Sequence, residues 1–180
     1  VLTAGKDVQA TYLLNCQLKA NGKLLVEGRK GVIIGGKTCA KLGVSCNGIG
    51  NIAEIATVVS VGIDKEDMTA YQELQKKIEQ TQAELQTCEN GLNKLMANPV
   101  HDEKVSMMIQ RLTRAVYTLK SSRKELFSER NAQMEQMTKQ KEARIQVSGR
   151  AYPGTLLFLN EDPFAIKEIY NNVEFVKHDN

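Results

Sequence analysis

The chain has 180 residues and a mass of 20.0 kDa, enough for one ordinary domain or two small ones. Hydrophobic residues make up 42% and charged residues 25%, close to globular averages, so the composition argues against wholesale disorder. The net charge is only +3, which gives no case for a nucleic-acid partner. No apolar run approaches the ~20 residues of a membrane-spanning helix, so the sequence predicts no membrane span.

Residues 1–63 predict a series of short strands. Apolar and polar residues alternate from Val8 to Ala20 and again near Val59, and this period of two is typical of strands. Ten of the 13 glycines fall in this segment and interrupt the strands every few residues. No long helical stretch separates the strands, which disfavours a doubly wound α/β sheet. The alternation is already under way near Val1, so we expect the chain to be part of a longer protein.

Residues 64–145 predict two long helices with coiled-coil seams. The segment has one Gly and one Pro and is rich in Glu, Gln, Lys and Arg. Asn98 and Pro99 are expected to end the first helix, and Asp102 is the expected N-cap of the second. Apolar residues recur at spacings of three and four in both helices. The predicted seam residues are Leu74, Ile78, Leu85, Leu92, Leu95, Ile109, Leu112, Val116, Leu119 and Leu126.

These two helices are expected to pair with each other as an antiparallel hairpin, because a connection of about five residues returns a neighbouring helix antiparallel. Residues 64–97 carry four Lys against seven Asp and Glu, a net charge of −3. Residues 103–144 carry ten Lys and Arg against five Asp and Glu, a net charge of +5, so the pairing is also favoured by charge. Leu85 is expected to pack near Leu112 or Val116. The alternative, a long parallel oligomeric coil, is disfavoured by Pro99.

Residues 146–180 return to strand character. Thr155 to Leu159 is an apolar strand, Asn160 to Pro163 is expected to form a turn, and residues 169–176 are a candidate last strand. This tail is too short to be stable alone, so we expect it to pack on the first β segment. The predicted domains are therefore a β-solenoid body of residues 1–63 and 146–180 and an inserted helical hairpin of residues 64–145.

Glycine-bounded strands indicate how the β body is built. Residues 21–28 resemble residues 31–37, since each is a short strand bounded by glycine. Repeats of this kind favour stacked coils with apolar side chains inside and glycines at the corners. The glycines assigned to corners are Gly31, Gly35, Gly36 and Gly154. An antiparallel sandwich is the alternative, and periodicity alone separates the two poorly.

Three segments resemble the bacterial flagellar assembly protein A (FapA) family. Residues 31–40 resemble a glycine-rich coil of that family, residues 61–64 resemble the stretch before its helical insert, and residues 151–155 resemble its return from the insert. The order and spacing of the three segments agree. The resemblance implies a mixed β and α fold, namely a single-stranded right-handed β-helix interrupted by a long antiparallel coiled-coil hairpin. It also implies a role in flagellar assembly or polar localisation, exercised through protein contacts.

The segment from Gly31 to Thr38 also matches the phosphate-binding pattern G-x-x-x-x-G-K-[ST]. That motif needs a strand before it and a helix after it. Here the variable positions Val32, Ile33 and Ile34 favour a strand of their own, and Gly43 would break a following helix. Nucleotide binding is therefore the unfavoured alternative, and we expect either Val32 and Ile34, or their neighbour Ile33, to point into the solenoid core.

Other candidate chemistry is sparse. The four cysteines match no zinc or redox spacing, so reduced, half-buried thiols are expected at Cys16, Cys39, Cys46 and Cys88. His101 and His178 have no positioned partner in the sequence, and the irregular repeats disfavour a hexapeptide acyltransferase. Asp64, Glu66 and Asp67 are expected to stabilise a helix start, and Lys37 and Lys41 are a candidate weak basic patch.

These observations predict a non-enzymatic scaffold of the bacterial cytoplasm that needs no cofactor or metal and acts through unidentified protein partners. A homo-oligomer is also compatible with the sequence. The candidate contact surfaces are the hairpin tip, Ala97 to Lys104, and the end of the second helix with Met134 and Met137. The alternative for these two methionines is packing against the β body where the hairpin begins.

Overall fold

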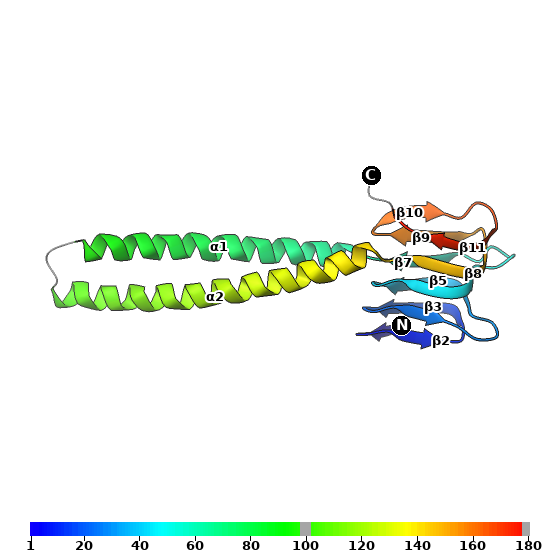
Figure 1. Ribbon diagram of the computed structural model, residues 1–180, viewed down its shortest axis with the longest axis horizontal. Coiled ribbons are helices and arrows are strands. Elements are labelled where there is room, and N and C mark those ends of the chain that lie inside the picture. The colour runs from blue at the N-terminus through cyan, green and yellow to red at the C-terminus, as the bar shows by residue number, and fades with distance from the viewer. Residues whose placement is uncertain (98–101, 178–180) are drawn as a thin grey trace. The chain divides into compact units, whose positions relative to one another are not determined.

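A computed structural model describes residues 1–97 and 102–177, within which the chain forms eleven strands and two helices (Figure 1). The strands before the helices are β1 Leu2–Ala4, β2 Val8–Ala10, β3 Leu13–Ala20, β4 Leu24–Val26, β5 Val32–Ala40, β6 Val44–Ile49 and β7 Thr57–Val61. The helices are α1 Lys65–Met96 and α2 Glu103–Lys141. The strands after the helices are β8 Ile145–Ala151, β9 Thr155–Leu159, β10 Asp162–Ala165 and β11 Tyr170–Phe175.

The described chain separates into two compact units. One unit comprises Val1–Asp67 with Gln136–Asn180, and the other comprises Met68–Glu135. The first therefore holds all the described strands together with the first turn of α1 and the last turns of α2, and the second holds the greater part of both helices. We call them the solenoid unit and the helical unit.

Parallel ladders organise the solenoid unit. The first ladder stacks β1, β3, β5, β7 and β9 in parallel, and the second stacks β2, β4, β6 and β8 in parallel. A third, shorter ladder pairs Leu13 with Ile33, Ile33 with Ile49, and Ile49 with Ala151. The chain visits the three ladders in the same order in each coil, so it forms a solenoid. Parallel pairing of this kind excludes the antiparallel sandwich.

The helices interrupt one coil between its first and second ladders. β7 continues the first ladder, α1 and α2 follow, and β8 then resumes the second ladder by pairing Ile145 with Val44. In the preceding coil the same junction is the short turn Lys41–Gly43 between β5 and β6. The helices therefore take the place of a corner turn, and the pairings of Ala40 with Val61 and of Val44 with Ile145 continue the two ladders on either side of them.

Inward-facing side chains stack from coil to coil to make the core. In the first ladder, Ala20, Ala40, Val61 and Leu159 lie in one column. In the second ladder, Leu24, Val44 and Ile145 lie in another. All of these side chains are buried, and burying a Val, Leu or Ile side chain contributes about 1.5–3 kcal/mol. Ile33 is fully buried whereas Val32 and Ile34 are half-buried, so of these three candidates Ile33 is the core residue.

The C-terminal end of the solenoid unit is closed by antiparallel strands. β10 pairs with β9 and β11 pairs with β8, and Ile166 and Phe175 are buried there. The predicted turn at residues 160–163 is right for Asn160 and Glu161, which both have positive φ, but wrong for Asp162 and Pro163, which begin β10. Proline is tolerated there because β10 pairs on one side only among the described strands.

In the helical unit α1 and α2 contact each other through polar side chains in their central parts. Lys120 pairs with Glu89 at 2.9 Å, and the Arg123 guanidinium donates to the Gln82 side-chain oxygen at 2.8 Å. Leu85, between Gln82 and Glu89 on α1, is buried, and its packing near Leu112 or Val116 stays a prediction.

Candidate functional site: a groove on the outer face of the solenoid

Outward-facing side chains of the first ladder form two rows that run across the strands. One row contains Gln17, Lys37, Val58 and Leu156 in register. The other contains Thr3, Lys19, Cys39, Ser60 and Phe158. Because successive side chains of a strand point to opposite faces, the same alternation that fills the core also presents these residues outside.

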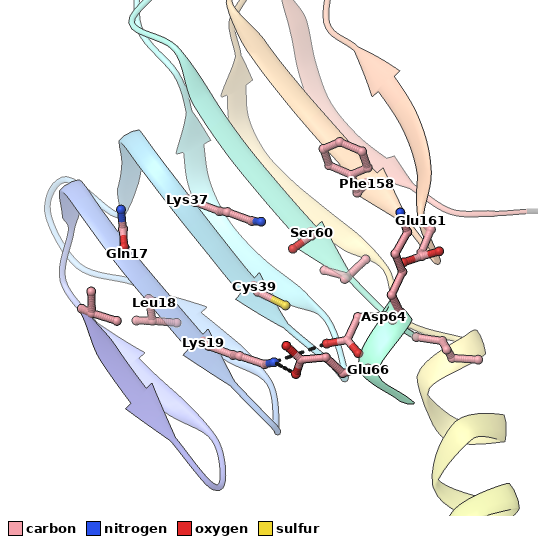
Figure 2. A pocket seen from close by; sticks show the side chains of 15 residues that line it. Gln17, Leu18, Lys19, Lys37, Cys39, Ser60, Asp64, Glu66, Phe158 and Glu161 are labelled. Atoms are coloured by element: carbon pink, nitrogen blue, oxygen red, sulfur yellow. Dashed lines mark hydrogen bonds and ion pairs between the residues drawn. The ribbon is translucent and has the colours of Figure 1, made fainter. Parts of the chain in front are cut away.

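A groove of about 700 Å³ lies on this outer face and is bounded at one end by the first residues of α1 (Figure 2). Its floor includes Lys37, Cys39 and Ser60 from β5 and β7, and Phe158 of β9 adds an aromatic wall. Asp64 and Glu66 lie at its end beside Lys19 of β3. The groove therefore combines apolar and charged side chains drawn from strands that are distant in sequence.

Ion pairs attach the start of α1 to β3 and to the turn after β5. Lys19 contacts Glu66 at 2.5 Å and Asp64 at 3.5 Å. Lys41 contacts Asp67 at 2.5 Å, and its side chain is only 12% exposed. Since both partners of the Lys41–Asp67 pair are largely shielded from water, this pair is screened less than the exposed Lys19–Glu66 pair.

The Asp64 carboxylate is the centre of this network. It accepts a hydrogen bond from the Asp67 backbone N–H at 2.9 Å, while the Asp64 backbone N–H donates to the Asp67 carboxylate at 3.3 Å. Such a reciprocal cap satisfies backbone donors that a helix start leaves unpaired. Burial alone would raise the pKa of Asp64, but the Asp67 N–H, Lys41 and Lys19 together hold that pKa below its ordinary value.

Lys19 responds to the same neighbours. Its hydrogen bond to Glu66 is the main reason that the pKa of Lys19 lies above its ordinary value, with burial opposing and Asp64 reinforcing the shift. Lys37 makes no ion pair among residues 1–97 and 102–177, but Lys41 is mostly buried against Asp67. Lys37 and Lys41 therefore do not act as one basic patch.

Sequence patterns identified the acidic helix start but missed the groove. The spacing of Asp64 and Asp67 fits a capping box, which is a local signal that could have been used to predict the reciprocal cap. No local signal predicts that Lys19 lies beside Glu66, because 47 residues separate them and only the coil register brings them together.

The residues matching the phosphate-binding pattern are placed in a strand. Val32–Ala40 is β5, and the next residues are the turn that leads into β6. The Thr38 side chain is buried in the core, and its hydroxyl has no hydrogen-bond partner in the described part of the chain. A phosphate loop needs that hydroxyl at its surface and a helix after it, so this segment does not have that geometry.

The four glycines assigned to corners all have positive φ. Asn15 also has positive φ, and it occupies in the preceding coil the corner position that Gly35 occupies in the next one. A Cβ atom on Gly36 would lie 2.2 Å from the Cys16 carbonyl oxygen, and one on Gly154 would lie 2.6 Å from the Glu54 carbonyl oxygen. Glycine is therefore required at both positions for close backbone approach as well as for left-handed conformation.

Each of the ten predicted seam residues is at least half-buried. Leu74, Ile78, Leu85 and Val116 are buried, and the half-buried remainder are Leu92, Leu95, Ile109, Leu112, Leu119 and Leu126. The Asp102 carboxylate accepts a hydrogen bond from the Val105 N–H at 2.8 Å, so Asp102 caps α2 as predicted. Met134 is 56% exposed and Met137 is half-buried.

Part of the predicted tip, residues 98–101, lies outside the described residues, and so do both histidines, His101 and His178. The four cysteines are free thiols, of which Cys46 is buried. Within residues 1–97 and 102–177, no group of three or more His, Cys, Asp and Glu side chains is placed to hold a metal ion. Neither helix, in its described part, is long and apolar enough to cross a membrane.

Comparison with known proteins gives one family. The model of the flagellar assembly protein A β-solenoid domain matches residues 1–180, the whole chain. No curated protein and no solved structure matches the chain in the corresponding searches. The family agrees with the resemblance noted in the glycine-rich segments and with the stacked parallel ladders.

Proposed function

Since the chain belongs to the flagellar assembly protein A family through its β-solenoid domain, we propose that it is a non-enzymatic scaffold of the bacterial cytoplasm that works through protein contacts in flagellar assembly or polar localisation. The observation that carries this proposal is the family match over the entire chain. It leaves no residue for a separate catalytic domain within these 180 residues.

We further propose that residues 1–63 and 146–180 form a single right-handed solenoid body and that residues 64–145 form an antiparallel coiled-coil hairpin inserted into it. Support for the hairpin comes from the order of the contacts: Gln82 meets Arg123, Glu89 meets Lys120, and a Cβ on Gly91 would meet Leu112. From one contact to the next, the residue number rises in α1 and falls in α2, as it does in an antiparallel pair. The half-buried and buried seam residues at spacings of three and four support coiled-coil packing.

The groove supports contact rather than catalysis. Its most polar end is occupied by side chains that already pair with one another, namely Lys19 with Asp64 and Glu66. Ser60 lies in the groove and donates its hydroxyl to the Thr38 backbone carbonyl at 3.5 Å, whereas a nucleophile needs a positioned base. We therefore assign the groove no reaction and no cofactor.

A strain of the native host that lacks the protein tests the proposal when it is complemented with the full chain or with variants. The scaffold hypothesis predicts that full-length protein restores the number and position of flagella. A variant with Lys37→Ala in the groove is predicted to restore them equally. Saturable ATP binding by the purified full chain, abolished by Lys37→Ala, would instead favour nucleotide binding through residues 31–38 and contradict the scaffold hypothesis.

A further inference from the structure

The side of α2 that points away from its seam has an unusual combination of exposed residues. Met107 is 51% exposed and Tyr117 is 78% exposed, whereas the neighbouring seam residue Val116 is 9% exposed. At 100° per residue, several other exposed side chains share this side of the helix. We define the α2 outer face as Met107, Arg111, Arg114, Tyr117, Ser121 and Lys124.

Charge is one-sided over the middle of this face, whose two ends carry Glu103 and Glu125 on the same side of the helix. No Asp or Glu occurs between Glu103 and Glu125, although this stretch contains six Lys and Arg residues, Lys104, Arg111, Arg114, Lys120, Arg123 and Lys124. Lys120 is paired with Glu89, and Arg123 donates to Gln82, so both are engaged by α1. In the part of the chain that the structure describes, Arg111, Arg114 and Lys124 make no ion pair. Their positive charge is therefore not neutralised by a direct ion pair in the described part of the chain.

The corresponding side of α1 is different. Its exposed residues at the middle of the helix include Lys76, Glu79, Gln80, Gln86 and Asn90, which balance in charge and expose no large apolar side chain. The large exposed apolar residues of α1, Met68 and Met96, lie only near its two ends. The α2 outer face therefore differs from that of α1 in its exposed Met107 and Tyr117 and in the unpaired cations between them.

We propose that the α2 outer face is a docking surface for an acidic amphipathic helix of a partner protein. Met107 and Tyr117 lie ten residues apart, about 15 Å along the helix, and provide two apolar anchors about three turns apart. Arg111 and Arg114 lie between the anchors, so Glu or Asp residues flanking the apolar stripe of a partner helix would meet them. Tyr, Arg and Met are the residue types enriched at interface centres.

The choice of a helix over a nucleic acid follows from the arrangement of these residues. The three unpaired cations lie within 14 residues, about 20 Å along the helix, and a single aromatic residue accompanies them. Single-stranded nucleic acid binds to series of aromatic residues on which successive bases stack, and this face has no such series. A helix packs against a helix with ridges in grooves, and side chains at spacings of three and four match on both.

This inference deepens the proposed scaffold function by naming the partner's chemistry, and its test is separate from the flagellar phenotype. The probe is a synthetic 21-residue helical peptide with Leu at spacings of three and four and Glu at the flanking positions, labelled with a fluorophore. Its binding to the full chain is measured by fluorescence anisotropy at several salt concentrations. A single-stranded oligonucleotide is the second probe.

Saturable peptide binding is expected, and the double variant Arg111→Glu with Arg114→Glu is expected to weaken it at least about tenfold, because both cations are reversed. Tyr117→Ala is expected to weaken binding about fivefold and to leave its salt dependence unchanged, because it removes an anchor without altering charge. Lys76→Glu, on the outer side of α1, is the matched control and should change the affinity less than twofold. Circular dichroism of each variant checks that the helices persist.

Several results would overturn the proposal. They are no saturable peptide binding, an equal loss of affinity in Lys76→Glu, or tighter oligonucleotide binding that the double variant abolishes. Self-association of the chain that the double variant abolishes would identify a second copy as the occupant instead. A further outcome is that the double variant loses peptide binding and yet restores flagella in the deletion strain. That result would support the docking surface and contradict its role in flagellar assembly.

Discussion

The solenoid unit and the helical unit are stabilised in different ways. In the solenoid unit each inward side chain packs between the coils before and after it. Ala40, for example, is paired with Ala20, 20 residues before it, and with Val61, 21 residues after it. In the helical unit four of the ten predicted seam residues are buried and six are half-buried. The first arrangement gives a closed core and the second leaves much of each helix in contact with solvent. We infer that the solenoid supplies rigidity and the helices supply contact surface.

The largest expected effect comes from a substitution that destabilises the helical unit and leaves the solenoid unit folded. Leu85 is fully buried in its seam, so Leu85→Asp places a charge there without a partner and should destabilise the helical unit by about 4 kcal/mol. Thermal unfolding followed by helical circular dichroism should show the loss, with the strand signal retained. Ala83→Asp, at an exposed position of the same helix, is the control, and equal losses in both variants would contradict the seam assignment.

The reverse experiment breaks the solenoid unit while sparing the helices. Gly36→Ala forces a Cβ to within 2.2 Å of the Cys16 carbonyl oxygen at a left-handed backbone position. We expect the free energy of unfolding of the solenoid unit to fall by about 2–3 kcal/mol, since the left-handed conformation alone costs about 1–2 kcal/mol. Gly5→Ala meets no atom within 4 Å and should be nearly neutral in the same denaturant titration. Equal stability of the two variants would argue against the corner assignment.

A smaller, pH-dependent effect is expected where α1 begins. The pKa of Asp64 is lowered in the folded protein, so its contribution to stability is complete above the unfolded pKa of about 3.9 and is lost as pH falls through the lower folded value. The Asp67 amide resonance should follow this titration in NMR spectra, because that amide donates to Asp64. Asp64→Asn retains a capping oxygen and should abolish the titration. An Asp67 amide that titrates unchanged in Asp64→Asn would show that another group is responsible.

The smallest effect concerns thiol reactivity and distinguishes core from surface. Burial raises the pKa of the Cys46 thiol to about 12, with a backbone hydrogen bond from Gly48 opposing part of the shift. Since the thiolate is the reactive form, Cys46 should resist alkylation by iodoacetamide at pH 8 in the native protein. Cys16, Cys39 and Cys88 are half-buried and should react first in peptide mass spectrometry. Early modification of Cys46 would mean that the solenoid core opens readily.

Local patterns predicted the helices well and the solenoid only in part. The seam spacing and the Asp102 cap are local signals, and the observed bounds of α1 and α2 agree with them, whereas the predicted break at Asn98 and Pro99 lies outside the described residues. The level at which the helices meet is not local, so the partner of Leu85 on α2 stays a prediction. Residues far apart in sequence set the ladder register, as with Val44 and Ile145, so no periodicity could give it.

The candidate groove was least predictable for the same reason. Lys19, Lys37 and Phe158 line it only because the coils stack at this particular register. The assignment of Pro163 to a turn is wrong for a different reason. A proline beside a turn is normally part of that turn. Here β10 needs a hydrogen-bonded partner on one side only, so Pro163 fits in the strand.

The central claim is that one solenoid body is shared by the two ends of the chain and that the helical unit is an insertion into it. Replacing residues 68–135 with a short Gly-Ser linker tests this directly, because loop length changes the closure entropy only slowly. Circular dichroism, proteolysis and denaturant unfolding of that variant should report a soluble β protein with a single cooperative transition. An unfolded or aggregated product, together with independent folding of residues 1–63 alone, would contradict a shared solenoid.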